Sequence, residues 1–313
     1  MVFDSRYIKT LCATMAVVLL AACNSEDVGV ASYEDRTITL SYGTRSTSGT
    51  GENQFMSGET IWLWATGSTK ITAWRLSTDG NGKFTSSTNH YWPKDGTTLQ
   101  ATAIHGNFTR SPTEGVTTWS GIFTHTVKAE QTSEANYRLS DLLYCTATIG
   151  QWQSTNTLKF EHQLAKVEVT LACASGASIS DDVLANATVK LSGIKPTATF
   201  DCSTKAVTVT GTAGEVTLGK IFSSNSNVRE AIVAAEQTVS PLKFTITLND
   251  FPASGKSRTL TCSTSSATFS KGKKYKYTLT LNNNIIISNV TVSSWIDDES
   301  TTVTIPAAPV EGN

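Results

Sequence analysis

Cys23 is the first residue of the chain whose type and surroundings predict chemistry. It follows the small residues Ala21 and Ala22 at the end of the apolar run 11–22, and Arg6 and Lys9 precede that run. A basic segment, an apolar segment and then small residues is the order found in a secretory signal peptide. We therefore expect residues 1–22 to be a signal peptide. The apolar run is too short to cross a bilayer.

Residues Leu20-Ala21-Ala22-Cys23 resemble the lipobox of bacterial lipoproteins. That resemblance implies that the Cys23 thiol is alkylated with diacylglycerol and that Cys23 becomes the first residue of the mature chain. The polar, acidic residues 24–27 resemble the signal that sends lipoproteins of Bacteroidetes-type bacteria to the outer face of the outer membrane. We expect residues 23–35 to be an acylated tether on that membrane.

No other residues form a recognisable catalytic or metal-binding group. The four histidines are widely separated, and His162 shares an apolar face with Phe160 and Leu164, which predicts a core histidine. The acidic pairs 181–182 and 297–298 flank turns and are expected to be solvated. The sequence contains no GxSxG, HExxH, P-loop or dinucleotide motif. We therefore predict a protein that is not an enzyme and has no cofactor and no metal.

Four cysteines remain besides Cys23 and Cys12, which lies in the signal peptide. An even number of cysteines in an exported chain permits disulfides, with three possible pairings. Several of them nevertheless continue apolar faces, which favours buried thiols. No CxxC or Cys/His cluster indicates a metal site. The four are Cys145, Cys173, Cys202 and Cys262.

Composition argues against nucleic acid and leaves the tryptophans as candidates for sugar binding. The chain has 25 Lys and Arg against 26 Asp and Glu, and only 16% of its residues are charged. Such a balance provides no electrostatic attraction to a phosphate backbone. Trp62 and Trp64 lie on the face of a predicted strand opposite Ile61 and Leu63. They either belong to a core or form an exposed aromatic patch.

Apolar and polar residues alternate over many short segments, which predicts an all-β protein. Residues 37–42 alternate strictly, with Ile38, Leu40 and Tyr42 on one face. We predict two antiparallel β-sandwiches, residues 36–157 and 158–313. The other expected strands are 60–65, 71–76, 99–105, 121–127, 142–149, 187–191, 205–210, 242–248, 259–263, 275–281 and 285–292.

Two segments depart from this alternation. From Leu158 to Leu164 the apolar residues are even-numbered and share their face with His162, whereas from Ala165 to Cys173 the apolar face is formed by the odd-numbered residues. Such a phase slip predicts a β-bulge or a kink. Residues 228–236 are the longest helical candidate, although a short one.

Several segments resemble the fimbrillin-like, type V pilin-like lipoproteins of Bacteroidetes-type bacteria. The resemblance covers most of the mature chain and implies two transthyretin-like β-sandwiches after a lipoprotein signal peptide. It also implies a place on the cell surface or in a fimbrium. The segments that carry it are Leu158–Val167, Phe269–Leu281 and Val290–Trp295, with Tyr91-Trp92-Pro93 and Asp141-Leu142-Leu143-Tyr144 in the first half.

The resemblance further implies assembly by β-strand exchange. In such pilus subunits a trypsin-like protease cuts after an arginine behind the first strand, this strand leaves, and a strand of another subunit fills the groove. Here residues 37–42 are the candidate first strand, and Arg45, in a Gly/Ser/Thr-rich loop, is the candidate cleavage site, with Arg36 as a weaker one. The candidate donor, 302–305, is short and is followed by Pro306 and Pro309. A tip, accessory or anchor subunit and a surface adhesin that never polymerises therefore fit as well as a stalk subunit.

A second reading belongs to another functional class. A surface lipoprotein that binds glycans for a polysaccharide-uptake system would share the export signal, the lack of catalytic motifs and the tryptophans. The partners expected under the two readings are other pilus subunits, the outer membrane through the Cys23 lipid, and surface glycans or proteins.

Overall fold

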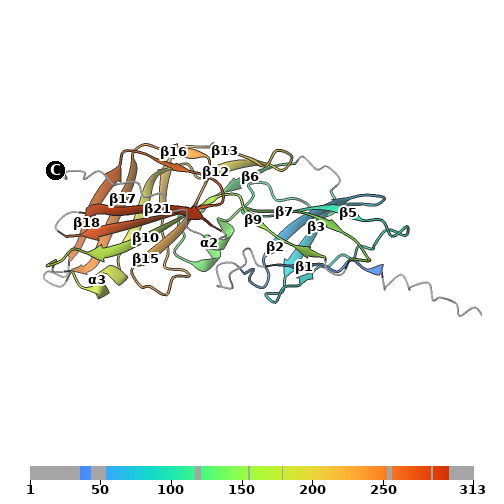
Figure 1. The fold of residues 1–313 in the computed structure, drawn as a ribbon, viewed down its shortest axis with the longest axis horizontal. Coiled ribbons are helices and arrows are strands. Elements are labelled where there is room, and N and C mark those ends of the chain that lie inside the picture. Colours follow the sequence, from blue (N-terminus) through green and yellow to red (C-terminus); the bar gives the residue numbers. More distant parts are fainter. Residues whose placement is uncertain are drawn as a thin grey trace, which may run out of the picture.

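The computed structural model describes residues 36–43, 54–116, 121–153, 156–177, 179–251, 256–282 and 285–295. These residues are mostly β-strand, with two short helices, α2 (Glu134–Leu139) and α3 (Asp181–Ala185). The molecule is elongated: β2, β3 and β5 lie toward one end, β17, β18 and α3 lie at the other, and α2, β6 and β12 lie between them (Figure 1). The prediction of an all-β fold is confirmed.

A six-stranded sheet forms the end of the molecule built from the first half of the chain. Its strand order is β4-β3-β2-β5-β7-β9, and every neighbouring pair is antiparallel. The strands are β2 (Thr60–Thr66), β3 (Lys70–Thr78), β4 (Phe84–Thr85), β5 (Leu99–His105), β7 (Leu143–Ile149) and β9 (Glu161–His162). The expected strand 99–105 matches β5 residue for residue.

Both faces of this sheet are buried. Ile61 and Leu63 belong to one apolar cluster, and Trp62 and Trp64 belong to another on the opposite side. The two tryptophans are only 9% and 7% exposed, so they are core residues and not a surface patch. Alternation showed that they share a face, but only the packed structure shows what covers it.

A small sheet packs on the face of the six-stranded sheet that carries Trp62 and Trp64, and it contains strands from both halves of the chain. Strands β6 (Ile122–Thr126), β12 (Thr197–Asp201) and β13 (Ala206–Thr210) form an antiparallel sheet in the order β13-β12-β6. Its residues Phe123 and Phe200 lie in the same cluster as Trp62 and Trp64. A strand from the first half therefore pairs with one from the second half.

Two four-stranded sheets pack face to face in the remaining part of the chain. Their orders are β15-β10-β20-β21 and β14-β11-β17-β18, and the largest apolar cluster lies between them. The strands are β10 (Ala165–Cys173), β11 (Thr188–Ile194), β14 (Gly214–Thr217), β15 (Val228–Val233), β17 (Leu242–Phe251), β18 (Lys256–Thr264), β20 (Lys273–Leu281) and β21 (Ile285–Ser294), with a small pair β16 (Gln237–Val239) and β19 (Ala267–Phe269). Neighbours are antiparallel except β10 and β20, whose long connection allows a parallel pair.

The helix expected over residues 228–236 is wrong. Residues 228–233 form β15, and all six are buried. Ala231 and Val233 face the cluster between the C-terminal sheets, whereas Ile232 faces the tryptophan cluster. In this strand the period of two disappears, because Arg229 and Glu230 are buried although charged and are followed by three consecutive apolar residues. Its periodicity therefore does not distinguish it from a buried helix.

The phase slip between Leu158 and Ala165 marks the passage from one sheet to another. Strand β8 (Thr157–Leu158) pairs with β1 (Ser41–Tyr42), and β9 pairs with β7. The chain then enters β10, which pairs with β15 and β20. The predicted kink is present, because the side chains must change their buried face when they change partner sheets. The expected boundary at 157/158 falls inside β8.

His125 on β6 makes the protein sensitive to acid. It is fully buried, its Nε2 lies 3.0 Å from the Ser140 carbonyl oxygen, and its Nδ1 accepts the Asn107 amide at 3.0 Å. Burial lowers the pKa of His125 from 6.5 to about 4. Between pH 6.5 and about pH 4 the unfolded chain therefore binds a proton on this ring, whereas the folded chain does not. The free energy of unfolding falls as the pH falls through this range.

We expect this one histidine to cost about 3 kcal/mol of stability by pH 4 relative to pH 7. The measurement is urea unfolding at several pH values, together with an NMR titration of the His125 ring. A ring that titrates near pH 6.5 in the folded protein would contradict the prediction.

Candidate assembly site

Residues 36–43 lie in a slot between two other segments of the first half. On one side the backbone bonds run from Trp92 N to Arg36 O at 2.7 Å, from Ile38 N to His90 O at 2.8 Å and from Tyr42 N to Gly82 O at 2.9 Å. On the other side Ser41 N donates to Asn156 O and Gly43 N donates to Leu158 O. The segment is thus held by hydrogen bonds along both edges, as an inserted strand would be.

The alternation predicted for this segment is confirmed by its burial. Ile38, Leu40 and Tyr42 are 4%, 6% and 8% exposed, whereas Thr39 is exposed. The three buried side chains join the cluster on the Ile61 face of the six-stranded sheet. They therefore cover the apolar groove of this sheet, although only residues 41–42 form a regular strand, β1.

Tyr42 is held in the groove by ring contacts and by a side-chain hydrogen bond. Its ring packs edge-on against Phe55 at 5.2 Å and lies tilted 4.9 Å from Phe84, measured between ring centroids. Its hydroxyl donates to Asp79 Oδ1 at 3.1 Å. Burial is the main cause that raises the pKa of Tyr42, so the hydroxyl remains protonated and continues to donate.

Three buried side chains provide a substantial but limited free energy of docking. Burying one large aliphatic or aromatic side chain contributes about 1.5–3 kcal/mol, so the three together contribute at most roughly 5–9 kcal/mol. This value is large enough to keep the segment in place in the intact chain. It is also small enough that another strand with a similar apolar face could contribute the same free energy by binding in the groove.

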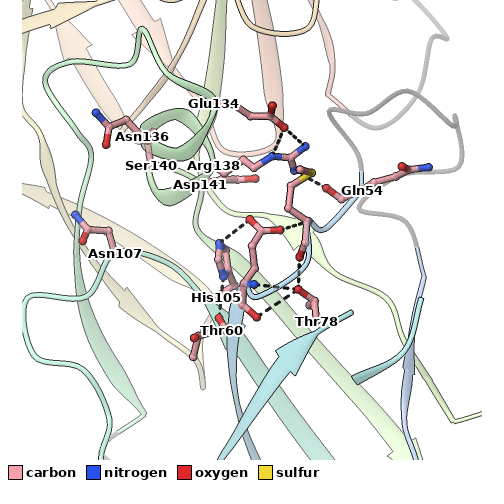
Figure 2. A network of polar contacts seen from close by, with 12 residues as sticks. Gln54, Thr60, Thr78, His105, Asn107, Glu134, Asn136, Arg138, Ser140 and Asp141 are labelled. Carbon is pink, nitrogen blue, oxygen red and sulfur yellow. Dashed lines mark hydrogen bonds and ion pairs between the residues drawn. The ribbon is translucent and has the colours of Figure 1, made fainter. Parts of the chain in front are cut away.

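The chain beyond the loop 44–53 is tied to the body of the protein. Arg138 Nη1 on α2 donates to the Gln54 carbonyl, and its Nε donates to Glu134 Oε1 at 2.8 Å (Figure 2). The Thr78 hydroxyl donates to the Met56 carbonyl, and Met56 N donates to Glu59 Oε2 at 2.6 Å. Residues 54–59 are therefore held at several points by hydrogen bonds that do not involve residues 36–43.

The two candidate modification residues, Cys23 and Arg45, lie outside the described residues, as do Asp297, Asp298, Trp119 and the candidate donor 302–305. Arg36 is described: its side chain donates to the Trp92 carbonyl at 2.6 Å and its own carbonyl accepts from Trp92 N. A protease needs an extended, unpaired substrate, so this pairing makes Arg36 a poor cleavage site in the folded chain.

His162 is a core histidine, as predicted. It is 3% exposed, its Nδ1 lies 2.9 Å from Asp141 Oδ2, and its ring stacks on Trp295 with centroids 3.8 Å apart. Trp295 is the last described residue of the C-terminal half, and β9 belongs to the first sheet. The stack therefore joins the end of β21 to the first half of the molecule.

The four cysteines are free thiols in the structure. Cys145, Cys202 and Cys262 are buried, in agreement with the expected core role, and Cys173 is half-buried at the edge of the largest apolar cluster. Burial raises the pKa of Cys145, Cys202 and Cys262 to about 12 and also raises the pKa of Cys173. A thiol with so high a pKa is a poor nucleophile and a poor metal ligand. Within the described residues no group of three His, Cys, Asp or Glu side chains is placed to hold a metal.

Sequence reasoning missed the residues that line the slot and tie its surroundings. Arg138, Asp141 and Asn156 come from segments far from residues 36–43. Arg138 and Asn156 belong to no motif, and Asp141 lies in a segment that indicated only the family resemblance. Only one signal pointed to them: the apolar residues Leu158 and Phe160 alternate like Ile38 and Leu40, and all four join the same cluster.

No helix among the described residues is long and apolar enough to cross a membrane.

Comparison with protein families shows to which family the chain belongs. Residues 44–295 match the model of the fimbrillin-like family. The chain belongs to the fimbrillin-like family. This match covers well over half of the chain and includes most of the described strands.

Individual relatives agree with this family. The chain of this fimbrillin-like protein is 24% identical over 304 residues to a Bacteroides uniformis protein named "Putative fimbrium subunit Fim1C", covering 92% of this chain and 93% of the relative. Two crystal structures, each of a protein described as a "putative cell adhesion protein", share its fold. The structure from Bacteroides uniformis has a TM-score of 0.61 and 20% sequence identity, and the match covers 83% of this chain and 97% of that chain. The structure from Bacteroides ovatus has a TM-score of 0.64 and 16% sequence identity, and the match covers 84% of this chain and 99% of that chain.

Proposed function

We propose that this fimbrillin-like protein is a non-enzymatic fimbrial subunit or adhesin on the cell surface, exported as a lipoprotein with its lipid on Cys23. The family match and the fimbrium-subunit relative support the fimbrial role. The Leu-Ala-Ala-Cys sequence at residues 20–23 supports the lipid anchor in the outer membrane. Residues 1–22 would be removed on export, and residues 23–35 would form the tether.

The docking of residues 36–43 supports assembly by β-strand exchange. Ile38, Leu40 and Tyr42 fill the groove of the first sheet, and backbone bonds hold both edges of the segment. Removing the segment would expose the groove and leave unpaired backbone groups on either side. A strand of another subunit with alternating apolar residues would satisfy both, which is β-strand addition. A head-to-tail contact of this kind does not close and extends into a filament.

Cleavage after Arg45 would start this exchange. The arginine lies between Gly43, where the docked segment ends, and Gln54, where the chain is tied to Arg138. A cut there frees residues 23–45 together with the Cys23 lipid, while residues 54–59 stay attached to the body. The lipid anchor would then be temporary, and its loss would prime assembly with other pilus subunits.

The test is Arg45→Ala in the full chain, with Arg36→Ala as the control. After treatment of outer-membrane fractions with a trypsin-like protease, we expect the wild type and the control to lose residues before 46, leave the membrane fraction and form SDS-resistant ladders. Arg45→Ala should stay on the membrane as a monomer. Equal release and laddering in both variants would place the cut elsewhere, and a wild type that stays an intact monomer would overturn the mechanism.

A further inference from the structure

Three loops meet at the end of the six-stranded sheet that lies away from the C-terminal half. They are residues 67–69 between β2 and β3, residues 93–98 before β5, and residues 150–153 after β7. The register places them together, because Thr66 is opposite Gln100 and Leu99 is opposite Ile149. The other end of β7 pairs with β9, which leads into β10, so these loops form the distal tip of the molecule (Figure 1).

Trp152 places an exposed indole at this tip. It is 79% exposed, and within the described part of the chain its side chain makes no hydrogen bond or ring contact. Its Nε1 would lie 3.0 Å from a Cβ on Gly96, so the glycine, with a φ of +70°, leaves room for the indole against the loop backbone. Asn156 braces the loop: its side chain accepts from Gly150 N at 2.9 Å and donates to Gly150 O at 3.1 Å.

A polar hollow of about 380 Å³ lies on the loop 93–98, which also contains Gly96. Its lining includes Arg36, Ser68, Tyr91, Lys94 and Asp95. Asp95 Oδ1 accepts from Ser68 Oγ at 3.2 Å, Thr97 N at 3.1 Å and Thr97 Oγ1 at 2.8 Å, which fixes the carboxylate in position. Its Oδ2 has no hydrogen-bond partner among the described residues and is available as an acceptor.

From this arrangement we infer that the distal tip is a binding subsite for a pyranose ring of a neutral glycan. A pyranose has an apolar C–H face and an edge of neighbouring hydroxyls. The apolar face fits against the exposed indole of Trp152, and the hydroxyls reach the free oxygen of Asp95 and the ammonium of Lys94 in the hollow. A few fixed polar groups beside an aromatic surface are what orients such a ligand.

The distribution of exposed apolar residues favours a sugar over a protein partner at this place. Of the large apolar side chains exposed in the described residues, Met56 and Leu139 line one pocket, and Val116 and Ile122 line another. Trp152 alone lies at the tip, and its neighbours are polar. A protein interface needs a continuous apolar centre, which is absent from the described residues here, whereas a sugar needs one aromatic surface and hydrogen-bonding groups.

This inference does not depend on strand exchange, because Trp152, Asp95, Lys94 and Ser68 all lie beyond the proposed cut. Only Arg36 would leave with the first segment. The experiment therefore uses the uncut full chain, purified in detergent. It consists of native gel electrophoresis through soluble galactan, mannan or xylan, with no protease present.

We expect at least one of the three polysaccharides to retard the wild type, and we expect Trp152→Ala to weaken that binding by about tenfold or more. Trp152→Phe should retain part of it, and Asp95→Asn should weaken it without changing the thermal midpoint. Ile122→Ala, which shortens an exposed apolar side chain elsewhere, should bind like the wild type. Absence of retardation by all three polysaccharides, or unchanged retardation of Trp152→Ala, would overturn the inference.

Discussion

Leu40→Asp is expected to drive residues 36–43 out of their slot without any protease. Leu40 is 6% exposed and lies in the apolar cluster of the first sheet. A carboxylate in that position would lose its hydration without gaining a partner, which costs several kcal/mol. Without Leu40, the remaining Ile38 and Tyr42 contribute at most roughly 3–6 kcal/mol, which the buried carboxylate would cancel, so we expect the segment to undock. We expect a loss of about 4 kcal/mol or more in the free energy of unfolding.

The matched control is Thr39→Asp, one residue away on the exposed side of the same segment. It adds the same charge, and we expect its stability to change by less than about 0.5 kcal/mol. Urea unfolding measures the stability, and amide hydrogen exchange at residues 82–92 reports whether the neighbouring edge has opened. Under the strand-exchange proposal Leu40→Asp should also form SDS-resistant ladders without cleavage. Identical stability and exchange in the two variants would show that the segment does not depend on its buried face.

Lys166→Met is the second large expected effect, and it concerns the core of the C-terminal half. Lys166 Nζ lies 3.0 Å from Glu230 Oε1, and the two side chains are only 1% and 3% exposed. Glu230 Oε2 also accepts the Phe222 amide at 3.0 Å. Removing the ammonium leaves a carboxylate buried without its counter-charge. We expect a loss of about 3–5 kcal/mol, measured by urea unfolding.

Two further variants test whether the loss of stability comes from the unpaired Glu230 carboxylate and not from replacing a lysine as such. Lys276→Met removes the exposed pair with Glu168 at 3.8 Å, and we expect it to cost less than about 1 kcal/mol. The double variant Lys166→Met with Glu230→Met should recover most of the loss, leaving about 1 kcal/mol for the unpaired Phe222 amide. A double variant as unstable as Lys166→Met alone would show that packing, not charge, makes Lys166 important.

Much of the fold was predictable because strand formation has a local signature. In a strand whose two faces meet different surroundings, side chains alternate with a period of two, so residues 99–105 and the buried face of residues 37–42 could be read directly. The same rule failed for residues 228–233, where both faces are buried, each face includes one charged residue, and the period of two disappears. The core roles of His162 and of the cysteines followed from the apolar faces that they share.

The candidate assembly site shows the limit of this reasoning. Alternation indicated which side chains of residues 36–43 turn inward, but it contained no information on the segments that receive them. Asn156, Gly82 and His90 form the slot through backbone atoms, which leave no trace in residue type. The ties from Arg138 to Gln54 and from Asp141 to His162 likewise join residues far apart in the chain.

The sequence by itself determined the all-β class, the family resemblance and the residues that form the apolar face of the first segment, and it predicts the export signal at residues 1–22. Only the tertiary structure decided that Trp62 and Trp64 are core, that β6 pairs with β12, that Trp152 is exposed at the tip, and that residues 36–43 fill a groove. The reason is physical. The periodicity of side chains is set along the chain, whereas burial and strand pairing depend on which distant segments meet.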